Sequence, residues 1–333
     1  MRIRPFLLAI VATALPAVGL AQGATPGAES PLIAEAAPQL KGTAALKGKR
    51  FYIAEYRVLF EVAGSATAST RAGYLPGRDF GGTRATVAYA LAKPNLALFQ
   101  AITDQAYADF LARLEAAGLK PEPADAFTRE NGAVYEATVE GSKPGAELVE
   151  DVDLGHGKRK YVVMVPTGTR AVSRGFIGIG AGNIGKRIDF SKTNMEGVSV
   201  GMALNLAAQE SSGTGSSLFK RESSANASAA MEVTMPPKTL GVLQTHARTE
   251  LVGLAAPMPV PGQFGTLRES GGYDTQKDAA VQAINMIGRL ALGVAGNNSK
   301  KVEMALEVDE PALQQQALKG LTAVNAGMAA ALQ

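Results

Sequence analysis

The chain contains no cysteine and no tryptophan, and it has only two histidines among its 333 residues. Without cysteine it forms no disulfide, and it lacks the residue that carries the lipid of a lipoprotein. A cysteine-based zinc site is excluded for the same reason. His156 and His246 are far apart in the sequence and have no suitably spaced partners, so we predict neither a metal site nor a histidine acid–base pair.

An excess of one charge is also missing. The formal net charge is +3, and it falls to +1 when Arg2 and Arg4 are removed with the N-terminal segment described below. No element concentrates Lys and Arg as a nucleic-acid-binding surface does, and we expect the basic run 158–160 to be solvated. After the N-terminus no run of roughly 18 apolar residues occurs, so the sequence predicts no transmembrane helix.

The N-terminus has the pattern of a secretory signal peptide. Arg2 and Arg4 precede an apolar stretch over 6–18, and small residues occupy positions −3 and −1 of a cut before Gln22. The apolar stretch is too short to span a bilayer, which needs roughly 20 such residues. We therefore expect residues 1–21 to be a cleaved signal peptide that exports the protein to the periplasm.

Residues 22–47 are rich in Ala, Pro and Gly, which predicts a flexible leader before a single domain over 48–333. Folding signals begin with an alternating pattern from Tyr52 to Val62, which predicts a long, half-buried strand. Its even positions are apolar, and its odd positions include Glu55, Arg57 and Glu61. The Gly/Ser/Thr-rich stretch 64–83 predicts a loop.

Three amphipathic helices are expected. The first spans 95–118, with Asn95 as N-cap and Gly118 at the C-terminal end. The others are a helix over 276–295 and a last helix from Pro311, capped by Asp309. The first helix has an apolar stripe and a wet face that includes Asp109 and Glu115; the stripe consists of Phe99, Ile102, Ala106, Phe110, Leu114 and Ala117.

Further strand-like runs alternate loosely with these helices. They cover 86–91, 134–139, 160–165, 198–208, 227–235, 240–254 and 302–308. Because strands and helices interleave without strict alternation, we predict an α+β (mixed α/β) fold. It would have a single sheet with the amphipathic helices packed on it.

The long strand KRFYIAEYRVLFEV, followed by a helix that ends in the turn Leu114 to Gly118, resembles the N-terminal half of CsgG-like and TolB-N-like periplasmic proteins. The later segment RGFIGIGAGNIGKR, followed by GVSVGMALNL, is similar to small CsgG-like proteins. The resemblance implies a periplasmic envelope protein that binds or assembles rather than catalyses. Its implied partner is another envelope protein or a second copy. The lipid-bearing cysteine common in that group is missing here.

One glycine-rich motif suggests nucleotide binding. Gly180, Gly182 and Gly185 have the spacing of the dinucleotide fingerprint, and with Lys186 they nearly form a P-loop. Both sites need a helix directly after the glycines, since the phosphate binds at its N-terminus. Residues 186–197 have poor helical periodicity, so we predict a glycine-rich hairpin or close-packed turn that binds no nucleotide. The alternative is a nucleotide-binding domain at Gly180–Gly185.

Two other motifs suggest catalysis or metal binding. Ser217 and Lys220, with Ser224, Asn226 and the Lys238-Thr239 pair, are similar to motifs of penicilloyl-serine enzymes. The stretch 211–228 reads as a loop, however, and the third motif lacks its glycine.

Asp151 and Asp153 resemble the start of a calcium loop, but Val162 stands where the EF-hand pattern needs glutamate. We expect a polar turn there. We therefore predict no catalytic, cofactor-binding or metal-binding residue. The expected function is that of a non-catalytic binding or assembly module of the cell envelope. The alternative is an exported hydrolase or cell-wall enzyme with scattered site residues.

Overall fold

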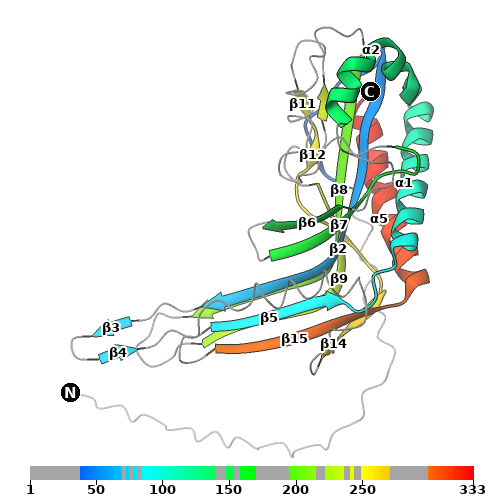
Figure 1. The fold of residues 1–333 in the computed structure, drawn as a ribbon. Helices are drawn as coiled ribbons and strands as arrows, with labels where there is room; N and C mark the ends of the chain where they lie inside the picture. Colours follow the sequence, from blue (N-terminus) through cyan, green and yellow to red (C-terminus); the bar gives the residue numbers. More distant parts are fainter. Residues whose placement is uncertain are drawn as a thin grey trace, which may run out of the picture. The chain divides into compact units, whose positions relative to one another are not determined.

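Long strands form one mixed sheet, and two helices pack side by side against it (Figure 1). The computed structural model describes residues 38–69, 73–75, 78–80, 84–139, 148–153, 158–169, 195–214, 222–235, 241–243, 249–270 and 299–333. The chain divides into residues 1–35 and 36–333, and the fold belongs to the second unit. The α+β class with one sheet and packed helices is confirmed. The expected helix at 276–295 lies outside the described residues.

Strand β2 (Phe51–Ser69) is the centre of the sheet. It runs parallel to β8 (Glu196–Thr214) and antiparallel to both β7 (Lys158–Met164) and β5 (Arg84–Leu91). Beyond β5 the sheet continues with β15 (Ser299–Val308), which is parallel to β5. The remaining strands are β1 (Leu40–Lys41), β3 (Gly73–Leu75), β4 (Arg78–Phe80), β6 (Leu148–Asp153), β9 (Glu222–Thr234), β10 (Gly241–Leu243), β11 (Thr249–Leu251), β12 (Gly253–Leu254), β13 (Met258–Val260) and β14 (Gly265–Glu269).

Helices α1 (Leu96–Ala116) and α5 (Glu310–Ala331) directly follow the neighbouring parallel strands β5 and β15, and they pack against each other. Both predicted N-caps are confirmed. The Asn95 side chain accepts a hydrogen bond from the Leu98 amide at 3.1 Å, and that of Asp309 accepts one from the Ala312 amide at 2.9 Å. Gly118 adopts φ +75° after the last turn of α1, a conformation that glycine adopts without strain.

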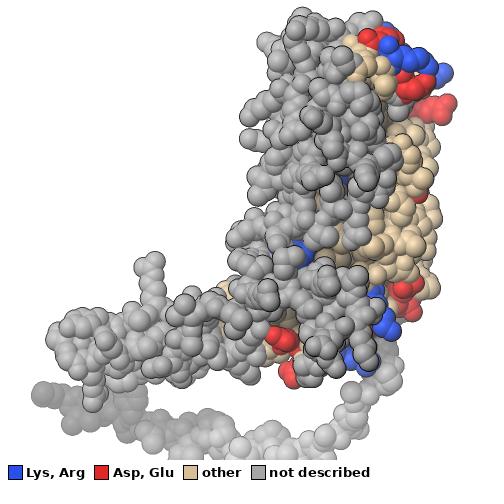
Figure 2. Space-filling model, viewed as in Figure 1, with Lys and Arg blue, Asp and Glu red and all other residues tan. Residues whose placement is uncertain are grey.

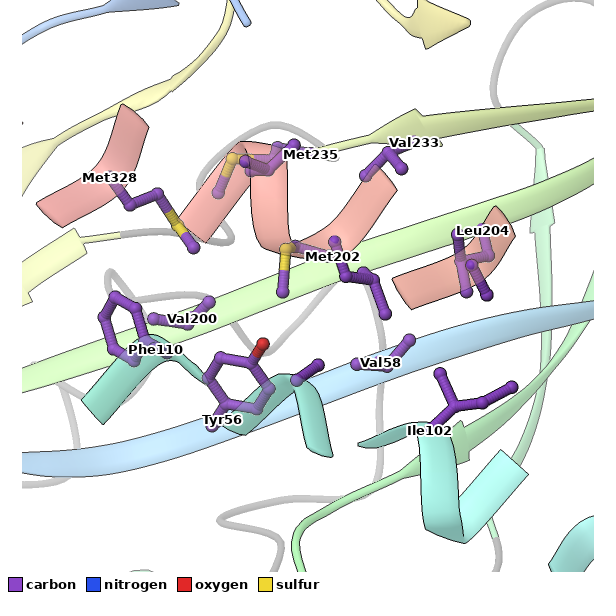
Figure 3. Close-up of a cluster of buried hydrophobic side chains, with 14 of the residues drawn as sticks. Tyr56, Val58, Ile102, Phe110, Val200, Met202, Leu204, Val233, Met235 and Met328 are labelled. Carbon is purple, nitrogen blue, oxygen red and sulfur yellow. The ribbon is translucent and has the colours of Figure 1, made fainter. Parts of the chain in front are cut away.

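The core between these helices and the sheet has the predicted composition. Tyr56, Val58 and Phe60 of β2 are buried against the apolar stripe of α1, including Phe99 and Phe110. The rings of Phe60 and Phe99 stack with their centroids 4.3 Å apart. Figure 3 shows side chains of β2, β8 and both helices meeting in this cluster.

Strand β2 is not half-buried, because its odd-numbered face is covered as well. Glu55, Arg57 and Glu61 are at most 4% exposed. The register shifts by one residue at two points of β2, against β8 between Ile53 and Glu55 and against β7 between Glu61 and Ala63. Each shift inverts the side-chain alternation, so that one even-odd rule cannot hold along the whole strand.

Three predicted segments differ in the structure. Strand β2 continues to Ser69 and is followed by the β3–β4 pair, so much of the expected loop 64–83 is strand. The expected strand 134–139 is helical and belongs to α2 (Ala124–Val139). Asn131 has non-helical backbone angles, so α2 consists of two helical pieces, and residues 134–139 lie in the second of them. In such a short run the residue types alone do not distinguish a strand from a helix. The expected strand 240–254 is divided into β10, β11 and β12.

Residues 38–47, which the composition placed in the flexible leader, are packed in the structure. Ala44 and Leu46 are buried, and their amides donate hydrogen bonds to the carbonyls of Ala331 and Leu332. Ordered packing therefore begins before position 48. Among the described residues, no helix combines the length and the hydropathy that crossing a membrane requires.

Candidate functional site

A group of buried polar residues lies on the face of β2 opposite the α1–α5 core. We call it the Glu61 cluster, and it consists of Glu61 on β2, Tyr89 on β5, Arg159 on β7, and Gln209 with the amides of Leu206 and Ala207 on β8. Four strands that are distant in sequence therefore contribute to one site. Glu61 is 1% exposed and Arg159 is 8% exposed.

Every accepting position of the Glu61 carboxylate is in use. Arg159 Nη1 donates to both carboxylate oxygens at 2.8 Å, and the Tyr89 hydroxyl donates to Oε1 at 2.5 Å. The backbone amides of Leu206 and Ala207 donate to Oε2 at 2.6 and 3.3 Å. An ionised carboxylate offers about four lone-pair sites, so this one is saturated.

The position of Glu61 follows from a fork in the sheet. Strand β8 pairs with β2 up to Leu204, opposite Phe60, and from Ala63 onward β5 takes its place beside β2. The β8–β9 register shifts between Asn205 and Ala207, just after the last residue of β8 that pairs with β2. The amides of Leu206 and Ala207 point into the fork, and the Glu61 carboxylate accepts a hydrogen bond from each of them. Glu61 thus satisfies backbone groups that the parting strands leave unpaired.

Arg159, on strand β7, forms hydrogen bonds with both of the strands that separate at the fork, β2 and β8. Its Nη1 also donates to the Ala207 carbonyl at 3.1 Å, so it contacts both Glu61 and β8. Burial raises the pKa of Glu61, while Arg159, Tyr89 and the two amides act against that rise. The expectation that 158–160 is a solvated basic run is wrong, because Arg159 and Lys160 are both buried. A buried arginine of this kind needs a charged partner, and the chain supplies Glu61.

Tyr89 lies across the backbone of its neighbour Gly64. Its hydroxyl accepts a hydrogen bond from Gln209 Nε2 at 2.6 Å while it donates to Glu61. Burial raises the pKa of Tyr89 well above its usual range, and the negative charge of Glu61 raises it further. The hydroxyl therefore keeps its proton and remains a hydrogen-bond donor. A Cβ on Gly64 would meet the Tyr89 phenol and lie 2.7 Å from Gln209 Nε2. A side chain at position 64 therefore requires Tyr89 and Gln209 to shift.

Replacing Gly64 by alanine tests this packing. We expect the Gly64→Ala variant to lose about 1–3 kcal/mol of unfolding free energy in urea denaturation, since the ring of Tyr89 must move to admit the methyl group. Gly132→Ala on α2 is the matched control, because a Cβ there meets nothing within 4 Å. It should be neutral or slightly stabilising. A Gly64→Ala variant as stable as the parent would contradict the placement of Tyr89.

A second row of polar contacts continues along the same face. The Tyr161 hydroxyl donates to Asn205 Oδ1 at 2.6 Å, and Asn205 Nδ2 donates to Glu232 at 2.7 Å. Nearer the start of β2, Ser199 Oγ donates to Glu55 at 3.3 Å. The polar residues of this face therefore bind one another across the strands β2, β7, β8 and β9.

This arrangement holds strands together rather than presenting a reactive group. A general base needs a lone pair that can face a substrate, and the hydrogen bonds of Glu61 leave none. The described residues contain no group of three or more His, Asp or Glu side chains placed to hold a metal ion.

The structure describes only some of the motifs singled out in the sequence. Gly180, Gly182, Gly185 and Lys186 lie outside the described residues, as do His156, His246, Ser217, Lys220, Lys238 and Thr239. Ser224 and Asn226 are in strand β9, opposite Ser212 and Glu210, and not in the expected loop. Asp151 and Asp153 are in strand β6, opposite Lys160 and Lys158, and not in a turn.

Sequence reasoning missed the Glu61 cluster because alternation assigned its charges to solvent. One usable signal was present: an acidic residue in one strand-like run and an arginine directly before another, with Gly64 close by. Gly64 indicates close approach of another group to the backbone.

No family model, curated protein or solved structure matches the chain.

Proposed function

We propose that the protein is exported to the periplasm and acts there as a non-catalytic binding or assembly module of the cell envelope. Its partner would be another envelope protein or a second copy of the chain. The N-terminal pattern of two arginines, an apolar stretch and a small-residue cleavage site supports export. One observation supports a non-catalytic role. Glu61 is the most buried carboxylate of the polar face, and hydrogen bonds within the protein occupy all of its accepting positions.

The surface of the helices supports a role in protein contact. Figure 2 shows a largely uncharged stretch of surface over the helices, with most of the charged side chains towards its two ends. Within α5 the only charged residues are Glu310 and Lys319, and many of the others are small. Depletion of charge is a feature of the centres of protein–protein interfaces.

The two enzymatic or ligand-binding alternatives lack comparable support. A hydrolase requires polar side chains converging on a substrate, whereas the described cluster of such side chains is internally hydrogen-bonded. Nucleotide binding would rest on Gly180–Gly185, which lie outside the described residues.

Cross-linking in intact cells tests the proposal. With its own leader, the protein should be recovered from the periplasmic fraction beginning at Gln22. After treatment with an amine-reactive cross-linker it should migrate above the mass of one chain. The same cells with Arg2 and Arg4 both changed to Glu provide the control, because a signal peptide needs its positive start. A soluble cytoplasmic pool that retains residues 1–21, or a cross-linked sample of single chains only, would contradict the proposal.

A further inference from the structure

Residues 38–46, which we call the strap, dock on parts of the chain that are far away in sequence. Strand β1 pairs with β12, and the Ala255 amide donates to the Gln39 carbonyl at 2.8 Å. Further along, the Ala44 and Leu46 amides donate hydrogen bonds to the backbone carbonyls of Ala331 and Leu332, each at 3.0 Å. The strap thus supplies donors to the C-terminal carbonyls of α5, which helices leave unpaired.

The receptor surface is shaped for the strap. Gly327 of α5 lets Leu40 and Pro38 approach, since a Cβ there would lie 3.1 and 3.2 Å from their side chains. Gly42 adopts φ +87° beside the Leu251 carbonyl, where a side chain would clash. With Ala44 and Leu46 buried, the strap has the contacts of an inserted peptide rather than of a loose leader.

A single turn connects the strap to the rest of the fold. The Lys49 amide donates to the Leu46 carbonyl at 3.0 Å, and Gly48 adopts φ +78° in the third position, as in a type II turn. A Cβ on Gly48 would meet nothing within 4 Å. Residues 47–49 are exposed, so an extended conformation at this turn would cost few packing contacts.

We propose that the strap is exchanged between two copies of this chain, each inserting residues 38–46 into the receptor surface of the other. This inference rests on the proposed assembly function and names its partner as a second copy. Every contact of the strap is available on the second copy, so a reciprocal exchange changes only the turn at 46–49.

Two single-cysteine variants provide the test, because the chain has no cysteine of its own. Lys41 is exposed and is the cross-strand neighbour of Gly253, where a Cβ meets nothing within 4 Å. Purified Lys41→Cys and Gly253→Cys chains, mixed and mildly oxidised, should form a disulfide heterodimer identified by intact mass. The control mixes Lys41→Cys with Glu115→Cys, a position on the exposed surface of α1.

The turn gives a second, independent readout. Valine disfavours a positive φ, so Gly48→Val should raise the heterodimer yield by about fivefold or more. Gly168→Val is the matched control. Gly168 adopts φ +80° in a turn with the same hydrogen bond, Thr169 amide to Pro166 carbonyl, and also has open space around it.

Each result decides between the possibilities. A heterodimer yield no higher than the control overturns the exchange. The double variant Lys41→Cys/Gly253→Cys then shows whether the strap stays on its own chain, by an intrachain disulfide, or is not seated on β12 at all. If cross-linking in cells still gives assemblies but the mixed cysteine variants give no heterodimer, the strap exchange is wrong and the proposed assembly function stands. If both experiments give only single chains, the strap exchange and the proposed function are both wrong.

Discussion

Replacing Arg159 by methionine should lower the unfolding free energy by about 3–5 kcal/mol, measured by urea denaturation at neutral pH. Methionine fills much of the same space but leaves the Glu61 carboxylate buried without its cation. Glu61 cannot reach water, because it is 1% exposed and lies inside the strand fork. The loss should therefore exceed that of an ordinary surface ion pair.

Arg268→Met is the matched control, because Arg268 also pairs with a glutamate, Glu307, at 3.2 Å, but both side chains are at least half exposed. Its loss should stay within about 1 kcal/mol. A double-mutant cycle isolates the buried pair. The double variant Glu61→Gln/Arg159→Met should lose less than the sum of the two single losses, by about 1 kcal/mol or more. Additive losses, or an Arg159→Met variant as stable as Arg268→Met, would show that the two side chains do not interact.

Truncation of Phe110 to alanine should cost about 3–5 kcal/mol of unfolding free energy, because it empties a fully buried site. Phe110 is 0% exposed, and its ring centroid lies 5.6 Å from that of Tyr56 (Figure 3). The lost volume borders both α1 and the sheet, so neighbouring side chains can refill it only partly.

Glu115→Ala, on the exposed side of the same helix, should change the stability by no more than about 0.5 kcal/mol. Asp109 is a poorer control than the sequence indicated, since it accepts hydrogen bonds from Asn325 at 3.0 Å and Arg113 at 2.8 Å. A near-neutral Phe110→Ala variant that loses its cross-linked assemblies would show instead that this face of α1 binds another protein.

The parts of the fold that depend on local patterns could be predicted from the sequence. The spacing of Phe99, Ile102 and Phe110 specifies one helical face, and Asn95 caps its own helix. The same holds for Asp309 and α5. These features need only residues within a few turns of each other, which is the range over which periodicity and capping act.

The parts that depend on distant pairing could not be predicted. Glu61 and Arg159 are 98 residues apart, and a charged residue in an alternating strand normally indicates solvent. The strap has the composition of a flexible leader, and its burial depends on carbonyls at the opposite end of the chain. The segment 134–139 has strand-like residues, yet it is helical and lies after the kink at Asn131 in α2.

The order of strands in the sheet has a consequence for the time course of folding. Strand β15 and helix α5 are at the end of the chain, yet β15 pairs with β5 and α5 completes the core around Tyr56. The Tyr56 hydroxyl and its acceptor Asn325 are 269 residues apart, a separation that makes contact formation slow. The core therefore closes only after β15 and α5 have been synthesised. Until then the apolar side chains of β2 and α1 lack their buried partners on α5, so the unfinished chain exposes surface that favours aggregation.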